Sequence, residues 1–165
     1  TIDGSALIDL PGITHIIESA SMPMADLIDF CQKQREENHL QDHAAVGHVW
    51  LDPMQNPRQN IGGQSPTHKI SPSVWVKETQ TLCPETACGS GTIAAALYLR
   101  STCPHDTYCI MQPSGHCLTV HFISTNGRSE IWIGGSVWEV ARGMAAIDIR
   151  YPSHTPNALR SHESE

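Results

Sequence analysis

Apolar and polar residues alternate in short stretches along most of the chain, and glycine and proline separate these stretches. Residues 4–10 form an apolar stretch that ends at Pro11-Gly12, and the β-branched residues of 14–18 follow directly. Short runs bounded by turn residues predict strands. The same pattern predicts strands at 44–51, 73–76, 116–123, 129–133, 137–140 and 144–149, with turns at Ser114-Gly115, Asn126-Gly127 and Gly134-Gly135.

Two stretches have helical character instead. The apolar residues between Met24 and Cys31 recur at helical spacing and predict a helix that ends near Asn38. Residues 89–98 are small and apolar, as in a buried helix, and begin with Gly89-Ser90-Gly91. The patterns together predict about eight strands and two helices. Because strands do not alternate with helices, the predicted class is α+β rather than a doubly wound parallel sheet.

Length and composition limit the organisation and the partners. A chain of 165 residues predicts one domain, which we place at 1–150, followed by a polar tail at 151–165. The formal net charge is −7 and no run of Lys or Arg occurs, which excludes the usual footprint of a nucleic-acid binder. The longest apolar run, 93–99, is too short to span a membrane. The expected partners therefore include neither nucleic acid nor membrane.

The cysteines favour a reduced environment. The chain has six of them, at irregular spacing, with no Cys-x-x-Cys and no N-x-S/T sequon. Disulfides are rare in reducing compartments, so this pattern predicts a cytoplasmic protein. The chain opens at Thr1 with neither an initiator Met nor a signal segment, which predicts a fragment or a processed product.

The segment 84–96, Pro-Glu-Thr-Ala-Cys-Gly-Ser-Gly-Thr-Ile-Ala-Ala-Ala, is the most informative about chemistry. It places Cys88 at the start of a predicted helix, where free backbone N–H groups stabilise anions and lower a thiol pKa. We therefore expect Cys88 to be the most reactive thiol at neutral pH, beside amides that hold a substrate carboxylate. The alternative is a glycine-rich turn before a packed helix, with Cys88 as a small buried apolar residue.

Three stretches of the chain resemble one family. The sequence 85–92 is similar to the second-cysteine motif of the diaminopimelate epimerase-like superfamily of pyridoxal-independent racemases and epimerases. Residues 12–15 resemble the Gly-Asn-Pro-His turn of that family, and 132–143 resemble its closing hairpin. The resemblance covers about residues 5 to 149, and only the motif at Cys88 is specific.

The resemblance implies a half-barrel of mostly antiparallel strands around a central apolar helix. It also implies an isomerase that works without a cofactor: one thiolate removes the α-proton of an amino acid, and a thiol on the opposite face returns a proton. The catalytic residues implied by position are Cys88, Glu85 and His15. The residues implied to hold the substrate carboxylate are Gly89, Ser90, Gly91 and Thr92.

The departures from the family concern the substrate and the second half of the site. Ile13 and Thr14 stand where diaminopimelate enzymes have asparagine and proline, and 45–48 replaces an asparagine-rich strand entry. These differences disfavour diaminopimelate, and the Glu-Thr-Ala-Cys version of the motif looks closer to the histidine racemases. The resemblance implies a second catalytic cysteine on an N-terminal half. We therefore expect a missing domain or a partner subunit, without which the chain racemises nothing.

Four other interpretations remain open at this stage. The chain could be a non-catalytic amino-acid-binding module, a diaminopimelate epimerase, or a thiol acyl-transfer enzyme that uses Cys88 with His15. The ten histidines suggest a metal site, with the pairs His39/His43 and His116/His121 as candidates. Zinc usually takes three or four ligands, so solvated or core histidines are favoured and no metal is expected.

Overall fold

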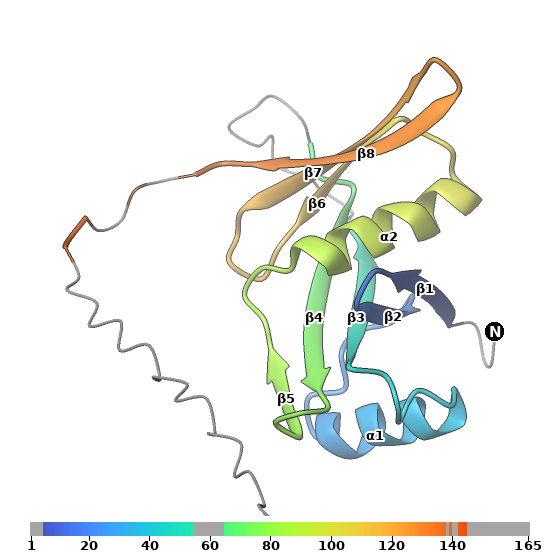
Figure 1. The fold of residues 1–165 in the computed structure, drawn as a ribbon, viewed down its shortest axis with the longest axis vertical. Coiled ribbons are helices and arrows are strands. Elements are labelled where there is room, and N and C mark those ends of the chain that lie inside the picture. Colours follow the sequence, from blue (N-terminus) through green and yellow to red (C-terminus); the bar gives the residue numbers. More distant parts are fainter. Residues whose placement is uncertain (1–4, 55–64, 138, 140–141, 145–165) are drawn as a thin grey trace, which may run out of the picture.

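One curled sheet and two helices make up the fold in the computed structural model, which describes residues 5–54, 65–137, 139 and 142–144 (Figure 1). The elements are β1 (Ala6–Leu10), β2 (Ile13–Glu18), α1 (Leu27–Glu37), β3 (Ala45–Pro53), β4 (His68–Val76), β5 (Thr81–Pro84), α2 (Gly89–Thr102), β6 (Thr107–Met111), β7 (Cys117–Thr125) and β8 (Arg128–Gly135). The architecture is a mixed α and β fold, in agreement with the expected class.

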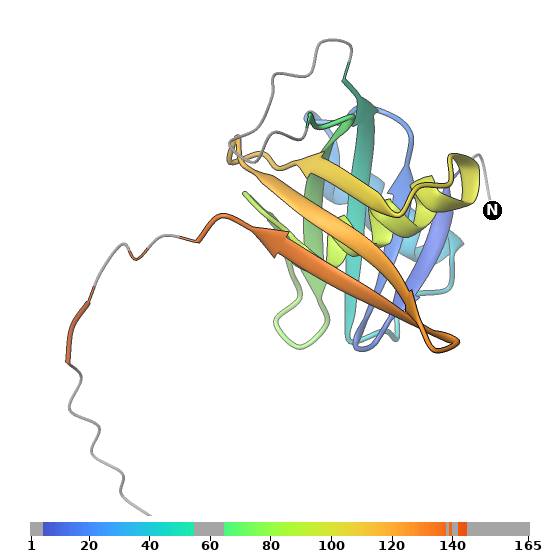
Figure 2. The same ribbon diagram turned by 90° about the horizontal axis from the view of Figure 1, so that it is seen from above.

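The sheet has the order β1-β2-β3-β4-β6-β7-β8, and β5 pairs with β4 beside this path. All neighbours are antiparallel except β2 with β3 and β4 with β6, which are parallel. Seen from above, the sheet curls around α2 as a half-barrel (Figure 2). This agrees with the expectation of mostly antiparallel strands around an apolar helix. Membership of one particular superfamily stays a prediction.

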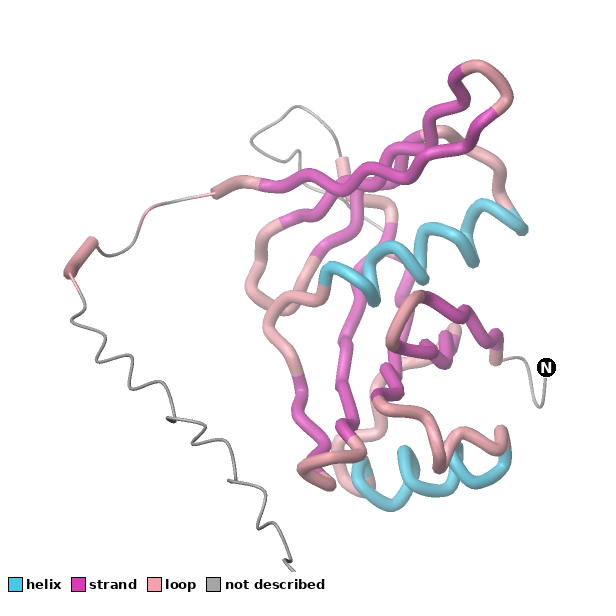
Figure 3. The backbone as a smooth tube through the Cα atoms, viewed as in Figure 1, coloured by secondary structure: helices cyan, strands magenta, loops and turns pink. Residues whose placement is uncertain are grey.

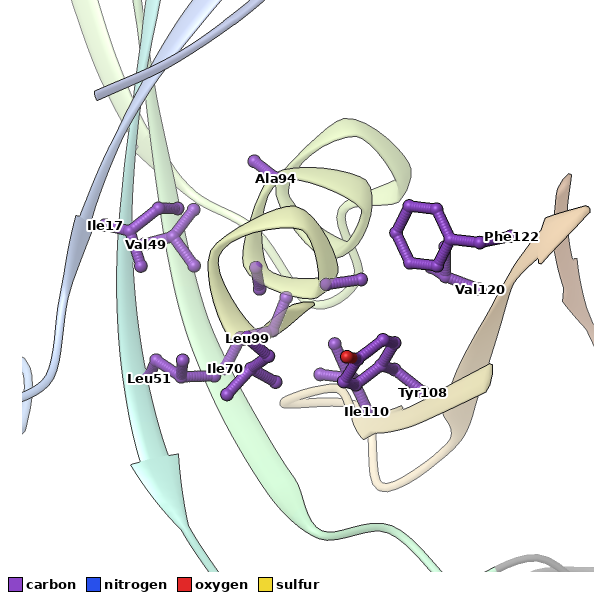
Figure 4. Close-up of a cluster of buried hydrophobic side chains, with 12 residues drawn as sticks. Ile17, Val49, Leu51, Ile70, Ala94, Leu99, Tyr108, Ile110, Val120 and Phe122 are labelled. Carbon is purple, nitrogen blue, oxygen red and sulfur yellow. The ribbon is translucent and has the colours of Figure 1, made fainter. Parts of the chain in front are cut away.

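Helix α2 occupies the centre of the main core. Its residues 94–96 are three alanines that are fully buried, and their small side chains let strands approach the helix from two sides. Figure 4 shows one side formed by Ile17, Val49, Leu51 and Ile70, and the other by Tyr108, Ile110, Val120 and Phe122. The alanine-rich stretch therefore fixes the helix inside the curl, with its first residue, Gly89, at one mouth of the half-barrel.

A smaller core lies under α1, on the other face of β3 and β4. Its buried members are Ile16, Leu40, Val46 and Trp75. Figure 3 shows α1 apart from α2, near one end of the sheet. Because successive side chains of a strand point to opposite faces, β3 contributes Val46 to this core and Val49 to the core around α2. A strand buried on both faces explains the continuous apolar character of residues 45–51.

Most predicted elements are present, with differences at their ends. The hairpin around Asn126-Gly127 is formed by β7 and β8. The predicted helix exists but begins at Leu27, and only Cys31 of its expected apolar positions is fully buried, while Ile28 is 68% exposed. The pattern predicted neither β5 nor β6. The proposed strand at 137–140 is not formed at Val137 or Glu139, and 145–165, including the expected tail, lies outside the described residues.

Candidate active site

Cys88 is the N-cap residue of α2. Its backbone is extended, at φ −136° and ψ 109°, and its Sγ accepts a hydrogen bond from the Gly91 N–H at 3.4 Å. The thiol thus takes the capping role that Ser or Asp usually fills. The side chain is buried, with 5% of its surface exposed. The sequence prediction that Cys88 lies at the N-terminus of a buried helix is therefore confirmed.

Backbone hydrogen bonds hold the segment before Cys88 against the sheet. The Glu85 N–H donates to the Pro72 carbonyl of β4 at 2.9 Å, and the Ser114 N–H donates to the Thr86 carbonyl at 2.9 Å. The segment is therefore tied to β4 on one side and to the β6–β7 turn on the other. These two bonds fix the backbone of the loop that leads into Cys88.

A buried glutamine, which the sequence analysis did not single out, also holds Cys88 in place. Gln112 follows β6 and is 3% exposed. Its Oε1 accepts from the Cys88 N–H at 3.1 Å, and its Nε2 donates to Thr92 Oγ1 at 3.0 Å and to the Ile110 carbonyl at 3.2 Å. One side chain therefore fixes both the capping residue and the first turn of α2. No local pattern marks Gln112, because the contact joins residues 24 positions apart.

Thr92 lies behind the thiol, with its polar groups already bonded. Its side chain is fully buried. The Thr92 N–H and Oγ1 both donate to the Cys88 carbonyl, at 3.0 Å and 2.5 Å. These bonds, together with the one from Gln112, make Thr92 part of the support of Cys88.

The first two amides of α2 remain available. Within the part of the chain that the structure describes, the N–H groups of Gly89 and Ser90 have no hydrogen-bond acceptor. Gly89 is exposed and Ser90 is half-buried, and Ser90 Oγ lies 3.6 Å from Cys88 Sγ. Unpaired N–H groups at a helix N-terminus, with the positive end of the helix dipole, form a place for an anion beside the thiol.

The two glycines of this turn have different surroundings. A Cβ at Gly91 would lie 3.1 Å from Cys88 Sγ and 3.2 Å from Val49 Cγ2. A Cβ at Gly89 would meet only Ile133 Cδ1, at 3.8 Å. Gly91 is therefore needed for the close packing of the thiol, whereas Gly89 keeps the approach to the amides open.

The expected lowering of the Cys88 pKa is wrong for this chain. Burial raises the pKa of the Cys88 thiol, and the nearby Glu85 carboxylate raises it further, against the opposing effects of the Gly91 N–H and the Ser90 hydroxyl. Desolvation of the thiolate outweighs the helix N-terminus. The expectation of an unusually reactive thiol at neutral pH loses its basis, and the effect of Glu85 shows that its carboxylate lies close to Cys88.

His15 is a residue of β2. It is fully buried in β2 and lies over Gly47 of β3, where a Cβ would come within 1.9 Å of His15 Nδ1. Neither ring nitrogen has a hydrogen-bond partner among the described residues. Burial lowers the pKa of His15 to about 4, so the ring is neutral at physiological pH. No hydrogen bond joins it to Cys88.

The other candidates from the sequence form no comparable site. Among the described residues, no three His, Cys, Asp or Glu side chains are grouped as metal ligands would be. His43 Nδ1 lies 2.9 Å from Thr14 Oγ1, and His121 Nδ1 lies 3.0 Å from Thr107 Oγ1. No described helix is long and apolar enough to cross a membrane.

Comparison with known proteins gives one informative match. No protein-family model matches the chain. The chain is similar to a histidine racemase of Fusobacterium nucleatum subsp. nucleatum, with 28% identity over 145 residues. The match covers 86% of this chain and 48% of the racemase, so the chain spans about half the length of that relative. The similarity therefore points towards a racemase or epimerase family, and extends well beyond the motif at Cys88.

Proposed function

We propose that this chain is one half of a cofactor-independent amino-acid racemase, of the diaminopimelate epimerase-like type, with Cys88 as one of two acid/base thiols. The observation that carries the proposal is the capping cysteine itself, buried at the first turn of α2 beside two unpaired amides. The similarity to a histidine racemase supports the same class. It also makes histidine the favoured substrate, ahead of diaminopimelate.

The carboxylate of the amino acid binds at the N-terminus of α2. The N–H groups of Gly89 and Ser90 donate to its oxygens, and the absence of a side chain at Gly89 leaves room for this contact. Removing the α-proton places negative charge on the carboxylate, and fixed N–H dipoles stabilise this charge as it develops. The turn therefore contributes to catalysis as well as to binding. Gly91 and Thr92 act behind this surface by holding the thiol.

Cys88 serves first as a proton donor. Because its pKa is raised, the thiol is protonated at neutral pH before substrate binds. A thiolate on the opposite face of the substrate removes the α-proton, and Cys88 delivers a proton to the other face, so the configuration inverts. In the reverse direction Cys88 must lose its proton, and the nearby Glu85 carboxylate accepts or relays it. His15 remains neutral and supports the sheet beneath α2.

The opposing thiol belongs to a second half. Because the chain covers 48% of its racemase relative, the remaining half of such a protein supplies this thiol and closes the site against water. We expect the chain alone to bind an amino acid weakly and to catalyse no exchange. The second half is a further domain of the same protein or a separate subunit.

The test follows exchange of the α-proton of L-histidine in D₂O by NMR, using this chain together with its second half. We expect exchange that Cys88→Ser reduces by roughly 10²- to 10⁴-fold, the usual contribution of a general acid or base. Cys103→Ser, at the other end of α2, is the matched control and should leave the rate unchanged.

A second measurement separates catalysis from binding. Histidine is titrated into the labelled chain while the amide signals of Gly89 and Ser90 are observed. Shifts of these signals without exchange in the joined halves would favour a non-catalytic binding module. Exchange of diaminopimelate but not histidine would correct the substrate. Neither exchange nor shifts with any amino acid would overturn the proposal.

A further inference from the structure

Three sulfur atoms gather on the outer face of the β6–β7 hairpin, away from Cys88. They belong to Cys109, Met111 and Cys117, which we call the sulfur cluster. In the strand register Met111 is directly opposite Cys117, and Cys109 is opposite Thr119. Cys109 is therefore the diagonal neighbour of Cys117 on the same face. This is the face opposite Tyr108, Ile110 and Val120, which point into the core around α2.

The cluster is compact and largely shielded from water. Cys117 Sγ lies 3.9 Å from Met111 Sδ. Both cysteines are buried, each with 6% of its surface exposed, and Met111 is half-buried. Burial, together with the adjacent Cys109 thiol, raises the pKa of Cys117 to about 12. Both cysteines are free thiols, so two thiols and one thioether, all soft donors, lie together.

The positions suit a shared metal ion better than a disulfide. Diagonal residues of an antiparallel pair have Cα atoms about 7–8 Å apart, whereas a disulfide needs less than about 7 Å. A metal with sulfur ligands at about 2.3 Å holds them about 4 Å apart when three ligands surround it in a plane. The observed 3.9 Å between Cys117 Sγ and Met111 Sδ matches this spacing.

We propose that Cys109, Met111 and Cys117 form a binding site for a soft monovalent cation of the Cu(I) class. Two thiolates and a thioether are the donor types that select Cu(I) over harder ions. On binding, the two thiols release two protons to solvent and form two metal–sulfur bonds, while Met111 adds a neutral third ligand. No electron is transferred. The proposal is independent of the racemase function.

A cleft opens beside one member of the cluster, Cys109. It has a volume of about 370 Å³, lies near the C-terminal end of α2, and is lined by Cys109 together with Cys103, His105 and His68 among others. Cys103 Sγ and His105 Nε2 lie 3.5 Å apart and are exposed.

The test titrates the full chain without oxygen against Cu(I) held by the coloured chelator bicinchoninate. The wild-type chain is expected to withdraw one equivalent of Cu(I). Cys117→Ser and Cys109→Ser should each lose this tight binding. Cys103→Ser and Cys83→Ser, which remove exposed thiols, should retain it. Zn²⁺, tested in the same way, should not compete.

Met111→Leu removes the thioether but keeps a side chain of similar size. It therefore tests the site even if the cysteine variants fail to fold. X-ray absorption of the copper-loaded chain should show three sulfur ligands in the wild type and two in Met111→Leu, with weaker Cu(I) binding by the variant. Unchanged affinity and ligand number in Met111→Leu would overturn the site as described. So would loss of binding that follows Cys103 or Cys88 instead of Cys109 and Cys117.

Discussion

The two ends of α2 carry a cysteine each, and the two residues have opposite surroundings. Cys88 caps the N-terminus, is 5% exposed, and touches the Gly91 N–H. Cys103 caps the C-terminus, is exposed, and lies 3.5 Å from His105 Nε2. The helix dipole favours a thiolate at the first end and disfavours it at the second. Burial acts in the other direction at Cys88, whose pKa is raised. Solvent access therefore matters more than the dipole here.

Residues in and just after β6 form hydrogen bonds with both ends of α2. Gln112, just after β6, bonds the Cys88 N–H, and Tyr108 within β6 bonds the other end. The Tyr108 hydroxyl donates to the Cys103 carbonyl at 2.7 Å and accepts from the His105 N–H at 2.8 Å. The difference lies in what surrounds these bonds: the Gln112 contacts are buried, whereas Cys103 and His105 are open to water.

The largest expected effect is the loss of stability when the hydrogen bonds at the N-terminal end of α2 are removed, compared with those at its C-terminal end. Gln112→Leu should lower the free energy of unfolding by about 2 kcal/mol, because the buried Cys88 N–H loses its acceptor. Tyr108→Phe should cost about 1 kcal/mol or less, because water can replace the lost bonds at the exposed end. Urea unfolding of both variants measures the difference. An equal or larger cost for Tyr108→Phe would contradict the contrast between the ends.

The next effect concerns thiol reactivity. Iodoacetamide should label Cys103 faster than Cys88 by about tenfold or more near neutral pH, because each unit of raised pKa reduces the thiolate about tenfold and burial blocks the reagent. Peptide mass spectrometry gives both rates. In urea the two rates should converge. Faster labelling of Cys88 in the folded chain would restore the view based on the helix dipole.

A smaller effect separates the two glycines at the N-terminal end. Gly91→Ala should destabilise the chain by about 1 kcal/mol, because the new methyl group crowds Cys88 Sγ and Val49. Gly89→Ala should change stability by less than about 0.5 kcal/mol, since its surroundings are open. Thermal unfolding measures both. If the two variants behave alike, the close packing around Gly91 does not support the thiol.

The smallest expected effect tests Glu85. Its carboxylate raises the pKa of Cys88, so Glu85→Gln should lower that pKa and speed labelling of Cys88 near neutral pH by about threefold. The pH profile of labelling should shift to lower pH, because the thiolate forms earlier. Glu78→Gln, at an exposed position, is the control. An unchanged profile would mean that burial alone sets the reactivity of Cys88.

Local patterns determined much of the fold. The turn at Asn126-Gly127 specified the β7–β8 hairpin, and the short, largely apolar stretch of 45–51 predicted β3, because these signals act between near neighbours. The small residues after Cys88 likewise predicted a buried helix with a cysteine at its start, and α2 begins at Gly89. The start of α1 was predicted too early because Met24, although apolar, is exposed and lies before the helix.

The environment of the site was decided only by the tertiary structure. The sequence by itself placed Cys88 at a helix N-terminus, and from that position alone its pKa should fall. The folded chain buries the thiol, sets Glu85 beside it and brings Gln112 to its N–H across 24 residues. Likewise, the sulfur cluster exists only because β6 and β7 pair in one register. Desolvation and cross-strand contacts depend on all the elements together, so no local pattern could have predicted them.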